Sequence, residues 1–310
     1  MPIYVMDDGC IFNTIQDAIN ERVEPSEIFH YEKNISSIHN LISKHFNKEV
    51  YVSDDYINYK IKDRYIYDHL SSPEISSLRD SFLSLFITLN RLTKFDSESF
   101  FDEKIFEEDD FFASSFIQEK FSGFISNRDI IDSNWWNKDL HHKLNDSDEA
   151  IDLFKNKKLS ENENYQFFFK NKHVFWPNCY FHTGSTNRFS NLCVSELEHL
   201  PNLINHLDFL NREATKLYSA DPLPDNFIAA AASKGVELSP ESPKTRQNHA
   251  AMAQRNITIN DKKILCEWHT KLTPTAGRVH FNLNISEPDA ISEVVNGKVI
   301  IGIYTKHFDT

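Results

Sequence analysis

Three segments near the end of this 310-residue chain alternate between apolar and polar residues. They run over Lys263–Lys271, Arg278–Ile285 and Lys298–Lys306. Alternation with a period of two is typical of a β-strand with one buried face and one open face. The pattern predicts three antiparallel strands whose apolar residues pack on a core and whose polar residues share one open surface.

The predicted open surface is rich in basic and aromatic side chains. It collects His269, Lys271, Arg278, His280, Tyr304 and Lys306. Arginine and lysine stabilise charge on phosphoryl oxygens, and histidine transfers protons near neutral pH. A tyrosine can stack on a base. The set therefore predicts binding or metal-independent cleavage of a phosphodiester, and a 2′-hydroxyl nucleophile would restrict the substrate to RNA. The alternative is the ordinary solvated side of a half-buried sheet.

Further cations flank these strands. We predict that they help to bind the substrate: Lys244, Arg246, Arg255 and His307. Lys244 and Arg246 lie in a segment with several prolines and hydroxyl residues, which is also the composition of a plain connection. Asp261, Glu267 and Lys271 loosely resemble a metal-nuclease set, but the usual E-x-K spacing is missing, so we expect neither a metal nor another cofactor.

Short phrases in the last third of the chain resemble the RelE/ParE toxin superfamily. They are HTK at 269–271, GRVHF at 277–281 and GKVIIGIYTKHF at 297–308, and they follow a predicted strand at Val174–Phe181 and two helices. The resemblance implies a β-α-α-β-β-β domain with an antiparallel sheet. It also implies an RNA-cutting activity, often at the ribosome, on the surface that carries the six residues above.

The rest of the chain predicts a second domain. Apolar residues recur at helical spacing over 35–46 and 78–92, and an aromatic-rich helix is expected over 101–121. Strand signals are few, with short strands near Val50–Val52 and Tyr65–Tyr67. The polar segment Asn134–Asn164 is the expected boundary or long loop. We therefore predict an α+β protein with a mainly helical domain over residues 1–165 and a RelE-like domain over 166–310.

Secondary structure within the second domain can also be predicted. Strands are expected at Phe167–Phe169 and Val174–Phe181, and helices around 203–217 and 227–232. The segment Lys234–Pro243 is expected to be a loop, followed by one or two helical turns at Thr245–Gln254.

Charge is distributed unevenly between the two predicted domains. The net charge is −13, and residues 251–310 hold seven Lys and Arg against six Asp and Glu, or +1, which leaves −14 for residues 1–250. An acidic protein does not coat nucleic acid indiscriminately, but a local anion site in the last segment is compatible with this balance. The acidic domain is expected to regulate the other domain or to bind a protein partner.

Composition excludes several functional classes. Seven glycines and the lack of GxGxxG and GxxxxGK[ST] motifs argue against dinucleotide and P-loop sites. Four scattered cysteines without CxxC spacing predict reduced thiols. Without a long apolar run, we expect no membrane association and a cytoplasmic location.

These observations predict an RNA endonuclease, a toxin-like effector of the kind used in phage defence. The alternative is a non-catalytic component of a bacterial defence or regulatory complex that binds nucleic acid or protein.

Overall fold

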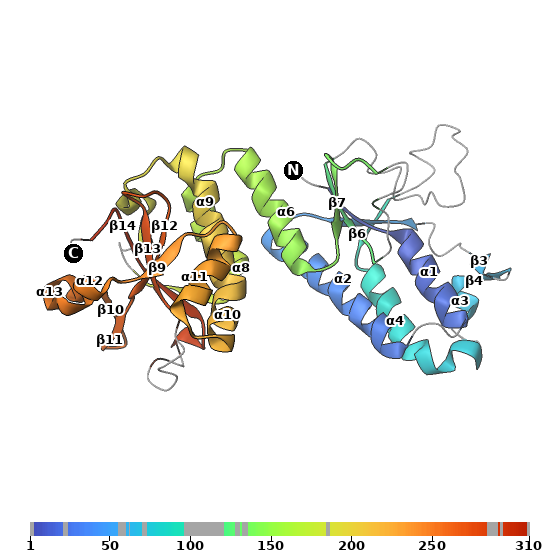
Figure 1. Ribbon diagram of the computed structural model, residues 1–310. Helices are drawn as coiled ribbons and strands as arrows, with labels where there is room; N and C mark the ends of the chain where they lie inside the picture. The colour runs from blue at the N-terminus through green and yellow to red at the C-terminus, as the bar shows by residue number, and fades with distance from the viewer. Residues whose placement is uncertain are drawn as a thin grey trace. The chain divides into compact units, whose positions relative to one another are not determined.

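The structure is a computed structural model of the chain. It describes residues 3–20, 24–54, 60–61, 63–69, 73–95, 121–127, 131, 136–183, 187–283, 291 and 294–308. The chain divides into two compact units, Met1–Lys158 (unit 1) and Leu159–Thr310 (unit 2), and each is described by itself (Figure 1). The predicted boundary lay after residue 165. Both units mix helices with strands, and the prediction that the chain as a whole contains both kinds of element is confirmed.

Unit 1 is built on a parallel sheet. Its strands in spatial order are β5 (Thr93–Phe95), β2 (Val50–Ser53), β1 (Ile3–Met6), β6 (Ser122–Ile125) and β7 (His141–Leu144). Every neighbouring pair is parallel. The prediction of a mainly helical domain was therefore incomplete, because parallel strands covered on both faces lack the alternation that reveals a strand.

Helices surround this sheet. They are α1 (Asp8–Ile19), α2 (Pro25–His45), α3 (Ile66–His69), the 3-10 helix η2 (Pro73–Leu78), α4 (Arg79–Leu89) and α6 (Ser147–Ser160), and a small hairpin pairs β3 (Lys60–Ile61) with β4 (Arg64–Tyr65). The helical patterns over 35–46 and 78–92 are confirmed in α2 and α4, which pack on each other. The helix predicted over 101–121 lies outside the described residues, apart from Phe121. The predicted loop at 134–164 instead contains β7 and α6.

Local sequence explains why α2 begins where it does. Pro25 occupies the first turn, and the backbone N–H of Glu24 donates to the Glu27 side chain at 3.3 Å. A stripe of residues spaced three and four apart then faces the core: Ile28, Tyr31, Ile35, Ile38 and Ile42.

The strand order of unit 1 creates a switch point. From β1 the chain builds outward through β2 to β5, and it later returns to place β6 on the other side of β1. In open parallel sheets of this kind, the crevice beyond the carboxyl ends of the strands at such a switch is where ligands bind.

Unit 2 is built on a mixed sheet with strand order β8 (Cys179–Phe181), β14 (Val299–Thr305), β13 (Arg278–Asn282), β12 (Trp268–Lys271) and β9 (Leu238–Pro240). Only β8 and β14 are parallel; the other neighbours are antiparallel. A separate hairpin joins β10 (Asn256–Ile259) to β11 (Lys262–Leu265). The predicted strand at 263–271 is therefore two strands, and the one at 278–285 ends at Asn282 in the described part of the chain.

Helices and short turns complete unit 2. They are α7 (Tyr165–Lys170), α8 (Lys172–Phe175), η5 (Phe189–Leu192), α9 (Glu196–Phe209), a π-helical turn η6 (Leu210–Ala214), α10 (Thr215–Ala220), α11 (Pro224–Ser233), α12 (Pro243–Gln247) and α13 (His249–Ala253). The strand predicted at Phe167–Phe169 is wrong: these residues lie in α7, which Asn164 caps. The predicted loop at Lys234–Pro243 contains β9.

A β-bulge in β14 determines which side chains face which way. His280 pairs with Ile303 but Phe281 pairs with Ile301, so Gly302 is an extra residue opposite one step of β13. Beyond Gly302 the alternation is reversed, and Tyr304 pairs with Val279 on the same side as the core residue Phe281. The prediction that Tyr304 shares a surface with the histidines is therefore wrong.

Both faces of the sheet in unit 2 are covered. One face packs on helices, where Trp268 contacts Phe227 of α11 with ring centroids 5.2 Å apart. The other is covered by a cluster that includes Ile257, Ile264, Cys266 and Ile303, with Phe308 packed against it. The expectation of one open polar face is wrong, because the β10–β11 hairpin and the last residues lie over it (Figure 1).

Two smaller expectations can be compared directly. All four cysteines are free, as expected for reduced thiols. Among the described helices, none combines the length and the apolar character needed to cross a membrane.

Candidate functional site

Five polar residues of unit 2 meet between β9, β12, β13 and the end of α13. We call them the histidine cluster: Ser239, Glu241, Arg255, His269 and His280. His269 and His280 are opposite each other in the β12–β13 ladder, and their ring centroids lie 5.0 Å apart. On the edge strand, Ser239 is opposite His269. Because side chains two apart on a strand share a face, Glu241 comes to the same side.

Glu241 is the centre of the cluster. Its carboxylate accepts from both Nε and Nη2 of Arg255, at 2.9 and 3.3 Å, and both residues are buried. One carboxylate oxygen also lies 3.5 Å from Nδ1 of His269 and 3.7 Å from Nδ1 of His280. The Ser239 hydroxyl lies 3.3 Å from Nε2 of His269. The carboxylate therefore lies beside both imidazoles while Arg255 balances its charge, and Nδ1 of His280 lies 3.3 Å from the Cys266 carbonyl oxygen.

Both histidines are held neutral. Burial lowers the pKa of His269 to about 3, with further lowering by the positive charges of Lys271, Arg278, Arg255 and His307. Burial, followed by His269 and Arg255, lowers the pKa of His280 well below its usual value. The side chain of His280 is buried, whereas 13% of the side-chain surface of His269 is exposed to solvent. His269 is thus the member of the pair that solvent can reach.

The structure brings Lys271, Arg278 and Arg255 near His269, but each of these three cations has a protein partner. Lys271 forms an ion pair with Glu237 at 3.1 Å. Arg278 is buried, and its guanidinium donates to the carbonyls of Thr273, Pro274 and Ala276 at 2.6–2.9 Å, which closes the β12–β13 turn. These two cations of the predicted open surface therefore bind groups of the protein itself, a carboxylate for Lys271 and backbone carbonyls for Arg278.

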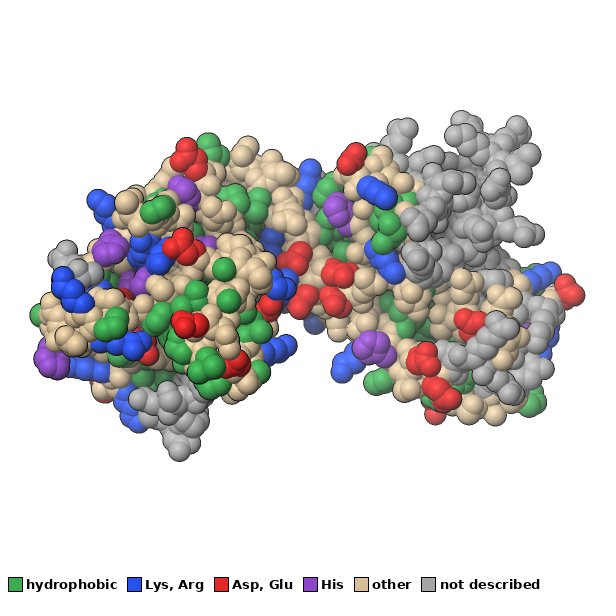
Figure 2. Space-filling model, viewed as in Figure 1, with side chains coloured by type: hydrophobic (Ala, Val, Ile, Leu, Met, Phe, Trp, Pro, Cys, Tyr) green, Lys and Arg blue, Asp and Glu red, His purple; other side chains and the backbone are tan. Residues whose placement is uncertain are grey.

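The remaining predicted residues lie outside the histidine cluster, although His307 is near enough to His269 to lower its pKa. Tyr304 is buried against Tyr165, with ring centroids 6.1 Å apart. Lys306 and His307 are exposed beyond the end of β14, and Lys244 is exposed on α12. Arg246 forms an ion pair with Glu267 at 3.3 Å. In Figure 2 basic and histidine side chains gather on the part of unit 2 that carries α12, α13 and the C-terminal residues, mixed with acidic ones.

Sequence reasoning missed Glu237 and Glu241 on the flanks of β9, and it placed Ser239 in a loop that could bind phosphate rather than on this strand. A signal was present, because the apolar residues Val236 and Leu238 alternate with them. Pro240 obscured it, since proline is confined to edge strands, which is where β9 lies.

Three cluster residues could also hold a metal ion. One ligand atom from each of Glu241, His269 and His280 lies within 4.8 Å of the others. Neutral imidazoles suit a transition metal. However, Arg255 already occupies both oxygens of Glu241, and the charges that lower the histidine pKa values also repel a cation. The electrostatics of the cluster therefore favour an anion.

No protein-family model matches the chain, and neither a curated protein nor a solved structure does. We therefore infer the function of the protein from the geometry of each unit.

Proposed function

We propose that unit 2 is a metal-independent RNA endonuclease with a RelE-like arrangement, serving as a toxin-like effector in phage defence. The order of elements supports the arrangement: β8, the helices α9 to α11 and the antiparallel strands β12, β13 and β14 follow one another as the resemblance implies. Between α11 and β12 the chain adds the edge strand β9, the short helices α12 and α13, and the β10–β11 hairpin.

One observation carries the proposal: a neutral, partly exposed imidazole lies among several cationic groups. Lys271, Arg255 and Arg278 surround His269 closely enough to lower its pKa. A phosphate bound there would offset these charges, which would raise the pKa of His269 toward the range of an effective general base.

The proposed reaction begins when the substrate replaces the Ser239 hydroxyl as the hydrogen-bond partner of His269 Nε2. Nε2 then accepts the proton of a ribose 2′-hydroxyl while the 2′-oxygen attacks the adjacent phosphorus. The bond to the 5′-oxygen breaks, and that oxygen takes a proton from water or from His307. Glu241 stabilises the imidazolium through Nδ1, and Lys271 stabilises the phosphoryl oxygens. The products are a 2′,3′-cyclic phosphate and a 5′-hydroxyl.

The test is cleavage of a labelled RNA by the full chain, with sequencing of the ends. We expect 2′,3′-cyclic phosphate ends, unchanged rates in EDTA, and no cleavage of the DNA of the same sequence. His269→Gln should lower the rate by about 100-fold or more, as for loss of a general base. His249→Gln, an exposed histidine on α13, is the matched control and should leave the rate unchanged.

A second function is favoured by the ion pairs themselves. Lys271, Arg246 and Arg255 each form an ion pair with a glutamate. These pairs favour a non-catalytic module, which would bind nucleic acid or would bind a protein through the acidic unit 1. RNA binding without any cleavage by the parent protein would support this function and contradict the endonuclease.

A further inference from the structure

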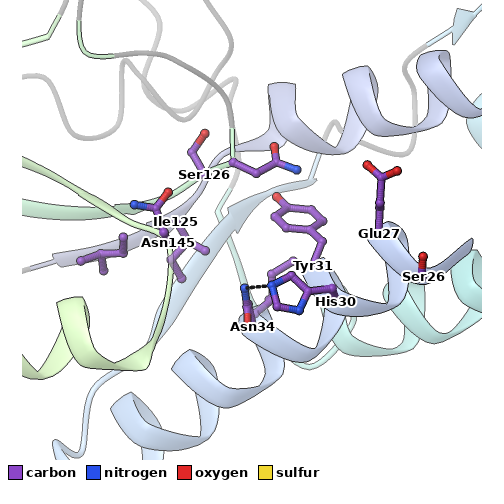
Figure 3. Close-up of a pocket in the computed structure, with 11 residues that line it drawn as sticks. Ser26, Glu27, His30, Tyr31, Asn34, Ile125, Ser126 and Asn145 are labelled. Atoms are coloured by element: carbon purple, nitrogen blue, oxygen red, sulfur yellow. Dashed lines mark hydrogen bonds between the residues drawn. The ribbon is translucent and has the colours of Figure 1, made fainter. Parts of the chain in front are cut away.

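Unit 1 contains a cavity of about 430 Å³ beside its switch point. One wall is formed by the first turns of α2, and the other by the residues that follow β6 and β7 (Figure 3). The cavity thus opens at the carboxyl ends of parallel strands, and its volume lies within the usual range for small-molecule sites.

The wall from α2 carries hydrogen-bonding groups. His30 and Asn34 are one helical turn apart, and the Asn34 amide lies 3.3 Å from Nε2 of His30. Glu27 adds a carboxylate, and the ring of Tyr31 faces the strand ends in Figure 3. Asn34 and His30 each have a hydrogen-bond donor and an acceptor. This wall can therefore bind a ligand that presents a donor and an acceptor side by side.

The opposite wall is partly fixed in place. The Ser126 hydroxyl donates to the buried carboxylate of Asp7 at 2.6 Å. The amide nitrogen of Asn145 donates to Glu149, the first-turn acid of α6, at about 3 Å, which leaves its carbonyl oxygen as an acceptor. Between the two walls the lining is apolar, with Ile125 and Leu144 buried. A rigid polar rim over an apolar floor is the usual construction of a small-ligand site.

The charges of the cavity restrict the ligand. None of the lining residues that the structure describes is Lys or Arg, whereas Glu27 lines the cavity and Asp7 lies directly behind Ser126. Such a wall repels phosphate. The amides and imidazole instead suit a heterocycle with adjacent donors and acceptors, as asparagine reads adenine, and the carboxylate suits ribose hydroxyls.

We infer that this cavity binds a nucleoside without phosphate, with the base on the apolar floor against Tyr31 and its edge read by His30 and Asn34. The site is separate from the histidine cluster, so it does not depend on RNA cleavage by unit 2.

Isothermal titration calorimetry of the full chain tests the inference. Adenosine, guanosine, cytidine and uridine are titrated beside ribose, which lacks the base, and AMP, which adds a phosphate. We expect at least one nucleoside to bind, ribose not to bind, and AMP to bind more weakly than its nucleoside. No nucleoside binding, equal ribose binding or tighter AMP binding would overturn the inference.

Matched variants on one helix locate the site. His30→Ala and Asn34→Leu should each weaken nucleoside binding roughly five- to tenfold, as for one lost hydrogen bond. His39→Ala and Asn40→Leu change the same residue types on α2 outside the cavity and should leave the affinity unchanged. His30 is exposed, so its replacement should not disturb folding, and circular dichroism checks this. Equal affinities across all four variants would contradict the assignment.

Discussion

At the scale of single residues, burial has changed the chemistry of the histidines. Histidine ordinarily titrates near neutral pH, which is why the sequence predicted proton transfer by His269 and His280. Inside unit 2 the uncharged form is enforced by desolvation, most strongly where solvent is excluded. Residue type alone could identify these side chains, but their protonation depends on their burial beside Glu241 and Phe308, which the sequence did not predict.

His206 allows this effect to be measured away from the cluster. It is buried in α9, and burial lowers its pKa to about 4. The unfolded chain therefore binds the proton more tightly, so the free energy of unfolding should fall as the pH drops from about 6.5 to 4, by about 1.4 kcal/mol per pH unit for this residue. In urea titrations at several pH values, His206→Phe should reduce the slope of the unfolding free energy against pH by the amount that corresponds to one bound proton. An unchanged slope would contradict the assignment.

At the scale of elements, the predictions succeeded for helices whose apolar residues repeat with one regular spacing. The stripes of α2 and α4 repeat every three to four residues and were recognised. The strands of the parallel sheet in unit 1 are four residues long or shorter, and β1, β2 and β6 are mostly buried. The sequence of β7 is HHKL, which resembles a surface loop. Its His141 is nevertheless buried against Trp136, with ring centroids 5.4 Å apart. The prediction of a strand at Val50–Val52 is confirmed in β2. The other short parallel strands are specified by their neighbours, and no local pattern revealed them.

The bulge in β14 can be tested at Gly302. A Cβ there would clash with the Cys266 sulfur and lie 3.5 Å from the His280 carbonyl oxygen. Gly302→Ala should lower the free energy of unfolding by about 1–3 kcal/mol, as overpacking does. Adding Cys266→Ala should recover part of the loss, which a double-mutant cycle in urea would measure. Strictly additive losses would show that this contact is unimportant.

At the scale of the whole molecule, each unit has a sheet and a buried core of its own. The sequence placed a boundary in nearly the right part of the chain because the polar residues there are frequent. It did not separate a linker from α6, whose exposed residues have the same composition as a loop.

Separate cores predict separate folding. Fragments 1–160 and 161–310 end between α6 and α7, close to Asn162, which has a positive φ of 56°. Each fragment should unfold cooperatively in urea, because its hydrophobic core lies within it. Near-ultraviolet circular dichroism of each fragment provides the measurement. A fragment without fixed tertiary signal would show that its core needs the other unit.

The extra glycine of β14 makes the facing of the last strand depend on how that strand is paired. Deleting Gly302 would leave Ile303 opposite His280 and Tyr304 opposite Val279, because the bulge already absorbs that one residue. If β14 instead kept Gly302 and paired without the bulge, Ile303 would turn toward the helices and Tyr304 toward the imidazoles. The same residues could therefore place an aromatic hydroxyl on either face of the sheet through a one-residue slip.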